Sequence, residues 1–264
     1  MLLTIVHQTT YRYDQTLPYA LQRIRQTPRT DALQTVDNWT LDLVGARDEV
    51  RFNDQFGNQC RLLSVEPNAN VVTVTAKGTV TTRNLNGISG QHTGFAPLWL
   101  FERDTVLTAR TPAIEALGCE PQEGDTLSHL HRLMEMVAER VAYVVGSTTS
   151  ETTADAALTG AQGVCQDHAH IFIAACRARG VPARYISGYL LMDSASEQVA
   201  SHAWAEAHIA GLGWVGFDVS NGISPDERYV RVAFGRDYRD AMPVAGIRQG
   251  TAQEQLEVHI TVEQ

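Results

Sequence analysis

One cysteine in this sequence stands where a helix is predicted to begin. The stretch GVCQDHAHIFIAACRARG, from Gly163 to Gly180, continues after Cys165 with apolar residues at helical spacing. The amino end of a helix carries a partial positive charge that stabilises a thiolate, and its free N–H groups can bind an oxyanion. Gly163 allows an unusual backbone turn and a close approach of substrate. Cys165 is therefore a candidate nucleophile, although a lone cysteine is more often a buried core residue.

Two predicted strands supply possible partners for this thiol. HAWAEAHIA and GWVGFDV flank the short turn GLG and favour an antiparallel hairpin. The position of the turn sets His202 directly or diagonally opposite Asp218 on one face, within reach of a hydrogen bond. A carboxylate in that place orients an imidazole and stabilises its charged form. Each residue alone also fits a strand-end histidine or a turn aspartate, but Cys165, His202 and Asp218 together predict nucleophilic acyl transfer.

Three residues close to this set in sequence are candidate substrate-binding residues. They are Gly163, Gln166 and Trp204. Trp204 lies two residues from His202 on the same strand face, so it can form a wall of the site. A position in the core is equally expected.

The other histidines favour structural roles. His168 and His170 follow Cys165 on the predicted helix, but no second cysteine or carboxylate completes a familiar zinc pattern, and no metal is predicted. We expect His129 and His131 to lie on the solvated face of another amphipathic helix.

Composition limits the classes of partner. The 264 residues carry a net charge of −9 and are 44% hydrophobic, which is typical of a globular protein of enzyme size. Nucleic acid and anionic membranes need a basic footprint, so neither is expected as a partner. The four cysteines are scattered along the sequence. The apolar run within the first residues, MLLTIVHQTTYRYD, is too short for a signal peptide. We expect a cytoplasmic protein with reduced thiols. The oligomeric state is not readable from the sequence.

The pattern of elements changes once along the chain. About the first 80 residues alternate with period two and are rich in Val and Thr, which predicts a small β-sandwich or curled sheet. The loop NLNGISGQHTG follows and places a domain boundary between 1–88 and 89–264. Helices are predicted from Asp125, over TTADAALTG and from Cys165 to Gly180, followed by strands, which indicates an α+β domain. The last strand, LEVHITV, can pair with the sheet of either domain.

Two segments resemble a known family. GVCQDHAHIFIAACRARGVPARYISGYL and SHAWAEAHIAGLGWVGFDVSNG are similar to the core of the transglutaminase-like superfamily, in the bacterial branch with a β-rich N-terminal domain. The resemblance implies a papain-like α+β core. It also implies Cys165 as nucleophile, His202 as general base and acid, and Asp218 as the orienting carboxylate.

The sequence departs from the family pattern in two places. Asp218-Val219-Ser220 stands where members often have Asp-Pro-Thr. No tryptophan lies between Phe101 and Cys165, where animal transglutaminases have one that helps to bind the oxyanion. No EF-hand-like loop supports calcium dependence, and no cofactor is implied.

Three functions therefore remain. The first is a cysteine hydrolase that cleaves an amide or peptide bond through a thioester. The second is a transamidase of the protein-glutamine gamma-glutamyltransferase kind, in which an amine outcompetes water. The third is an inactive binding module. The expected partner is a peptide, a protein or a small amide.

Overall fold

The β-rich part of the protein consists of two sheets that pack face to face. The computed structural model describes residues 1–120, 124–192, 197–198 and 200–264. One sheet has the order β11 (Glu197–Gln198), β16 (Glu254–Glu263), β1 (Leu2–Tyr13), β6 (Val71–Thr82) and β3 (Gln34–Val44). The other has the order β15 (Val244–Gln249), β2 (Tyr19–Thr27), β5 (Gln59–Val65) and β4 (Ala46–Asn53).

Alternating apolar residues hold these two sheets together. In β6, Val72, Val74 and Ala76 are buried while the residues between them are partly exposed. Val72 and Val74 pack in one cluster with Ile24 and Leu63 of the facing sheet. The period-two pattern of the sequence thus produces the predicted sandwich.

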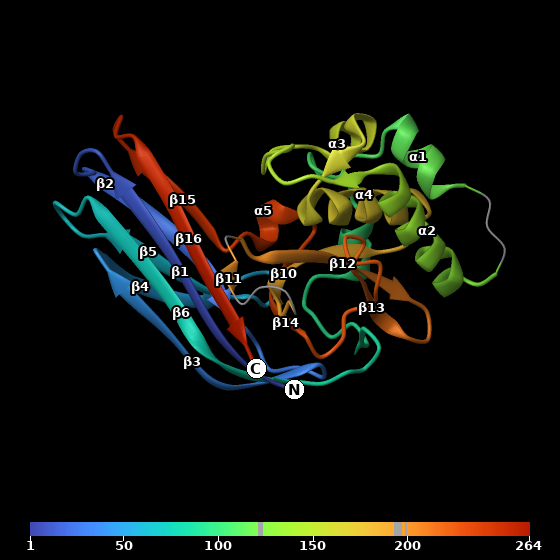
Figure 1. Ribbon diagram of the computed structural model, residues 1–264, viewed down its shortest axis with the longest axis horizontal. Helices are drawn as coiled ribbons and strands as arrows, with labels where there is room; N and C mark the ends of the chain where they lie inside the picture. The colour runs from blue at the N-terminus through green and yellow to red at the C-terminus, as the bar shows by residue number, and fades with distance from the viewer. Residues whose placement is uncertain (121–123, 193–196, 199) are drawn as a thin grey trace.

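A third sheet and the helices form the other half of the molecule, beside the sandwich (Figure 1). Its strand order is β14 (Tyr229–Gly235), β10 (Ala183–Leu190), β12 (His202–Ile209), β13 (Gly213–Phe217) and β7 (Ile88–Gly90). The helices are α1 (Pro112–Gly118), α2 (Thr126–Arg140), α3 (Ala154–Gly160), α4 (Cys165–Ala178), α5 (Tyr238–Ala241) and the 3-10 helix η1 (Leu98–Glu102). Two short strands, β8 (Ala142–Tyr143) and β9 (Gln162–Gly163), pair in parallel. No helix in the described ranges is long and apolar enough to cross a membrane.

Helix α4 is the centre of this half. It contacts α1, α2, α3, β10 and β12, and its residues from Asp167 to Arg177 are all buried. The residues Ala203, Ala205 and Ala207 of β12 belong to the same apolar cluster as α4. Small side chains let helix and strand approach closely, so the start of α4 is held firmly against the sheet. The predicted α+β fold is confirmed.

The predicted helix limits agree with the structure. Asp125 caps α2 by accepting a hydrogen bond from the Ser128 N–H at 2.8 Å, and Gly180 follows α4 with a φ of +71°. The expectation for His129 and His131 is wrong. His129 is buried and His131 packs 5.1 Å from the Phe217 ring, between ring centroids. His129 lies at helical spacing with Leu133 and Met136, so it shares their apolar face.

The C-terminal strands return to the sandwich. β16 pairs with β1 and β15 pairs with β2, so the segment 244–263 belongs to the sheets of the first half, not to the second as its place in 89–264 implied. The physical reason is that alternating Ile260 and Val262 complete an apolar cluster with Leu3 and Ile5. Figure 1 shows that the two chain ends consequently lie close together. The boundary near residue 88 stays a prediction.

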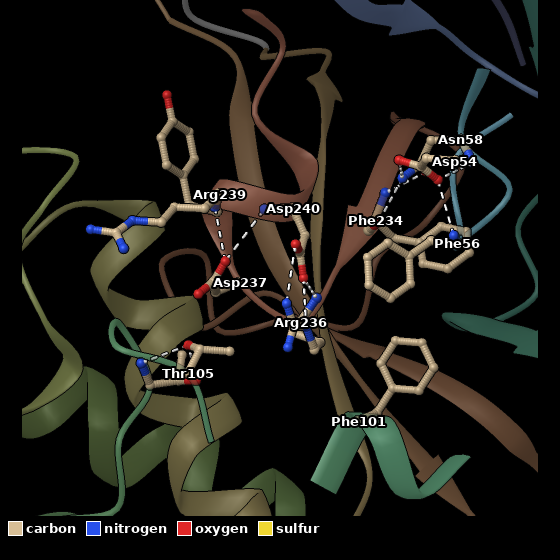
Figure 2. A network of polar contacts seen from close by, with 12 residues as sticks. Asp54, Phe56, Asn58, Phe101, Thr105, Phe234, Arg236, Asp237, Arg239 and Asp240 are labelled. Atoms are coloured by element: carbon tan, nitrogen blue, oxygen red, sulfur yellow. Dashed lines mark hydrogen bonds and ion pairs between the residues drawn. The ribbon is translucent and has the colours of Figure 1, made fainter. Parts of the chain in front are cut away.

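Two amide side chains join the halves at β14, an edge strand of its sheet. The Gln34 amide donates to the Arg231 carbonyl at 2.8 Å and accepts from the Arg231 N–H at 2.8 Å. The Asn58 amide likewise donates to the Phe234 carbonyl at 2.7 Å and accepts from the Phe234 N–H at 2.9 Å, as Figure 2 shows. Both pairs of bonds replace those that a neighbouring strand would make to the backbone N–H and C=O groups of β14. They also fix the sandwich against this strand.

Candidate active site

Cys165 is the first residue of α4, as predicted. The carboxylate of buried Asp167 accepts hydrogen bonds from the Val164 N–H at 2.8 Å and from the Thr148 hydroxyl at 2.6 Å. These bonds pin the turn that leads into the helix. Cys165 is half-buried, so the thiol lies at the positive end of the helix dipole and is still reachable from solvent.

Gly163 serves this turn in a different way from the one predicted. It is buried and pairs with Tyr143 in extended backbone, without a positive φ, so the expected unusual turn is wrong. A Cβ at Gly163 would lie 2.7 Å from the Cβ of Asp167. The missing side chain therefore makes room for the carboxylate that fixes the start of α4. A role for Gly163 in binding substrate stays a prediction.

His202 and Asp218 meet across the predicted hairpin. His202 begins β12, and Asp218 directly follows β13. The register pairs Ala205 with Phe217, which puts His202 and Asp218 in diagonal positions. The His202 Nε2 lies 2.6 Å from the Asp218 Oδ2, so the predicted contact is present. Asp218 is fully buried, which shields this contact from water.

His202 also reaches the thiol at the start of α4. The Cys165 side chain lies close enough to interact with the His202 imidazole, which is hydrogen-bonded to Asp218. Because Nε2 bonds to Asp218, the other ring nitrogen, Nδ1, is left for the sulfur. Burial is the largest single effect and lowers the pKa of His202. The interactions with Asp218 and Cys165 together outweigh burial and raise this pKa to about 10.

Two residues that the sequence analysis missed hold the carboxylate of Asp218. The Tyr229 hydroxyl donates to Asp218 Oδ2 at 2.7 Å, and the Asn221 side-chain amide donates to the same oxygen at 2.7 Å. Burial raises the pKa of Asp218, but the hydrogen bonds and charge of His202, with the bonds from Asn221 and Tyr229, lower it overall. Asn221 follows Asp218 by three residues, a turn pattern that was readable. Tyr229 arrives from β14, and no local signal pointed to it.

Trp204 and Gln166 occupy different surroundings beside the set. Trp204 is 1% exposed, and its ring lies 6.1 Å from the His202 ring at an angle of 26°. It therefore packs behind the imidazole as a core residue. Gln166 is half-buried and donates from its side chain to the Ser150 carbonyl at 3.2 Å. Substrate binding by either residue stays a prediction.

The two histidines of α4 bond to protein groups. His168 lies 2.9 Å from the Val141 carbonyl through Nε2 and 2.9 Å from the Ser220 hydroxyl through Nδ1. His170 accepts from the Tyr238 N–H at 3.1 Å, and burial, followed by the charge of Arg177, lowers its pKa to about 3. Across the described ranges, no three His, Cys, Asp or Glu side chains are grouped to hold a metal ion.

Known proteins resemble this chain over nearly its full length. Residues 117–219 match the model of the transglutaminase-like superfamily, and residues 3–81 match that of the bacterial transglutaminase-like N-terminal region. An uncharacterised protein from Mycobacterium leprae is 29% identical over 278 residues, with 98% of each chain covered. One from Mycobacterium tuberculosis is 29% identical over 272 residues, covering 92% of this chain and 86% of that one.

A solved structure has the same fold. It comes from Cytophaga hutchinsonii and is described as "a putative cysteine protease". The TM-score is 0.80 at 23% identity, with 100% of this chain and 90% of that chain covered. The agreement extends over both the sandwich and the α4-centred half.

Proposed function

This chain belongs to the transglutaminase-like superfamily, and we propose on that premise that it is a cysteine hydrolase that cleaves amide bonds through a thioester. The observation that carries the proposal is the position of His202, which is hydrogen-bonded to Asp218 and lies close enough to Cys165 to interact with it. A thiol, an imidazole and a carboxylate in this order are what nucleophilic acyl transfer requires.

The first half of the proposed reaction forms the thioester. The Cys165 thiolate attacks the amide carbonyl carbon, and the carbonyl electrons move to oxygen. The N–H groups at the start of α4 stabilise this oxyanion. When the oxyanion collapses, the C–N bond breaks, and the His202 imidazolium gives its proton to the leaving amine.

The second half releases the acid. Neutral His202 takes a proton from water as the water oxygen attacks the thioester. Collapse of the second oxyanion breaks the C–S bond and restores the thiolate beside the imidazolium. Asp218 stays ionised throughout, because its bonds to His202, Asn221 and Tyr229 all favour the charged form. It orients the ring and stabilises its positive charge.

Exposure near the nucleophile favours water over an amine as the acceptor. Tyr143 pairs with Gly163, two residues before Cys165, and is 52% exposed. Val144 and Val145 follow it with exposures of 40% and 79%. A transamidase needs a channel that keeps water from the thioester. These three side chains lie in solvent and do not themselves enclose a thioester at Cys165, which supports hydrolysis of a peptide, a protein or a small amide.

The test is the identity of the product. A library of acetylated peptide amides, including glutamine peptides, is incubated with the protein in ¹⁸O-labelled water, with and without cadaverine, and products are read by mass spectrometry. We expect acids that carry one ¹⁸O, and loss of activity in Cys165→Ala and His202→Ala but not in Cys119→Ala. A cadaverine amide as the main product would support the transamidase instead. Absence of any acyl-enzyme and any product would support the binding module.

A further inference from the structure

A cavity of about 420 Å³ lies at the seam between the two halves of the molecule. We call it the seam pocket. From the sandwich it takes Arg29 and the turn 53–57, and from the α4-centred half it takes Arg184, Arg231 and Phe234. Arg184 pairs with Glu206, which lies four residues beyond His202 along β12, or roughly 13 Å at the rise of a strand. The seam pocket is thus separate from the proposed catalytic set.

One guanidinium in the seam pocket is held in place by aromatic rings. The Arg184 guanidinium carbon lies 4.0 Å from the centre of the Trp214 ring and 4.2 Å from that of Phe234. Two of its nitrogens lie 2.6 and 2.7 Å from the buried Glu206 carboxylate. A cation between two rings with a fixed carboxylate partner is preorganised, which lowers the cost of ordering it for a ligand.

The second guanidinium is incompletely paired. Arg231 lies 3.3 Å from Asp31 through Nη1 and 3.5 Å from Glu206 through Nε. Its Nε is buried, and among the described residues its contact with Glu206 is longer than an ordinary hydrogen bond. A buried charged donor in that condition is costly unless an acceptor reaches the group. The third, Arg29, donates to the Gly57 carbonyl at the same cavity.

The charges around the seam pocket leave one positive charge over. The cations are the three lining arginines, Arg29, Arg184 and Arg231, and a fourth, Arg25. Arg25 is counted because it forms a buried ion pair with the lining residue Asp54 at 2.9 Å. The carboxylates are those of Asp54, Asp31 and Glu206. Four cations and three anions leave a surplus of one, in a protein whose net charge is −9. That balance fits one negative charge on a ligand, whereas a dianion would meet Asp31 and Asp54 without compensation.

Aromatic side chains surround these charges. The rings of Phe56 and Phe234 lie 6.3 Å apart and are seen beside Asp54 and Asn58 in Figure 2. Phe95, which also lines the cavity, is 94% exposed. A ring in full contact with water beside a cavity is an unused apolar surface that a flat ligand can cover.

From these contacts we propose that the seam pocket binds a small monocarboxylate with a flat apolar body. The carboxylate bonds to the guanidinium groups of Arg29, Arg184 and Arg231, for which a planar two-oxygen acceptor is the matched geometry. The apolar body lies among Phe56, Phe95 and Phe234. A cavity of this volume is within the range of small-molecule sites.

The test uses phenylacetate as the probe, titrated into the full-length Cys165→Ala variant and followed by calorimetry. This variant keeps the binding measurement independent of any catalysis. We expect saturable 1:1 binding, at least tenfold tighter than that of neutral phenylacetamide and tighter than that of phenyl phosphate. Arg231→Gln and, separately, Arg29→Gln weaken it at least tenfold. Arg47→Gln, at a position where the side chain is 66% exposed on β4, leaves it unchanged.

Each of four results would overturn the proposal, and the first three concern the ligands. They are no saturable binding of phenylacetate, equal binding of phenylacetamide, or tighter binding of phenyl phosphate. Unchanged affinity in both arginine variants would also overturn it. The two variants are separate so that a folding defect in one, visible as an altered circular dichroism spectrum, leaves the other as the test.

Discussion

The substitution Asp218→Asn removes the charge beside His202 and keeps an oxygen in its place. Three donors converge on Asp218 Oδ2, namely His202 Nε2, the Tyr229 hydroxyl and the Asn221 amide. The carbonyl oxygen of an asparagine accepts from the same three groups. The remaining position, Oδ1, accepts from the Asn221 N–H at 3.3 Å, and the NH₂ group of asparagine gives up this one long bond. The imidazole therefore keeps its orientation and loses its counter-charge.

The size of the effect follows from the pKa of His202. Its rise from 6.5 to about 10 corresponds to about 5 kcal/mol, at about 1.36 kcal/mol per unit. Asp218 and Cys165 both stabilise the imidazolium, and because burial opposes this stabilisation, their combined contribution exceeds the net rise. Loss of the Asp218 charge should therefore lower the pKa of His202 by at least about 1 unit.

Histidine NMR measures this pKa directly. The protein is labelled with ¹⁵N-histidine, the His202 signals are assigned by their loss in His202→Gln, and the midpoint is followed from pH 5 to 11. We expect a midpoint near 10 in the wild type and at least about 1 unit lower in Asp218→Asn. Asp37→Asn, at an exposed position on β3, should leave it unchanged. A wild-type midpoint near 6.5, or one that Asp218→Asn does not move, would refute the reasoning.

Three further predictions concern stability and the start of α4. Asn58→Ala leaves two half-buried backbone groups of Phe234 in β14 unpaired and should lower the free energy of unfolding in urea by about 2 kcal/mol. Asn53→Ala, on the exposed end of β4, should change it little. In Gly163→Ala the new methyl group pushes against Asp167, so alkylation of Cys165 by iodoacetamide should slow at least tenfold. An unchanged rate would mean that the turn before α4 does not position Cys165. The raised pKa of His202 adds stability that is complete below pH 6.5 and is lost as the pH rises towards 10. The difference in Tm between wild type and His202→Gln should therefore shrink over that interval, and a difference that grows would contradict the assignment.

Local patterns were sufficient to predict the elements that carry the proposed site. The helix start at Cys165 and the hairpin that joins His202 to Asp218 both depend on residues close together in sequence. Period and turn chemistry determine such features, so one sequence is enough to read them.

Features that depend on distant partners were not readable. Tyr229 reaches Asp218 from another strand. Strand β16 pairs with β1, although almost the whole chain separates them in sequence. His129 was misplaced because a polar side chain occupies the apolar face of α2. In each case tertiary packing decided the outcome, and no local periodicity reports which surfaces will meet.

The rate of alkylation of each cysteine by iodoacetamide at pH 6.5, mapped by mass spectrometry, tests the central claim most directly. Cys119 is exposed and serves as an internal control, while burial raises the pKa of both Cys60 and Cys176. An ordinary thiol is only about 1% ionised at this pH. We predict that Cys165 reacts at least tenfold faster than Cys119 in the wild type and no faster than Cys119 in His202→Ala. Equal rates in the wild type would contradict the assignment of Cys165 as a paired nucleophile.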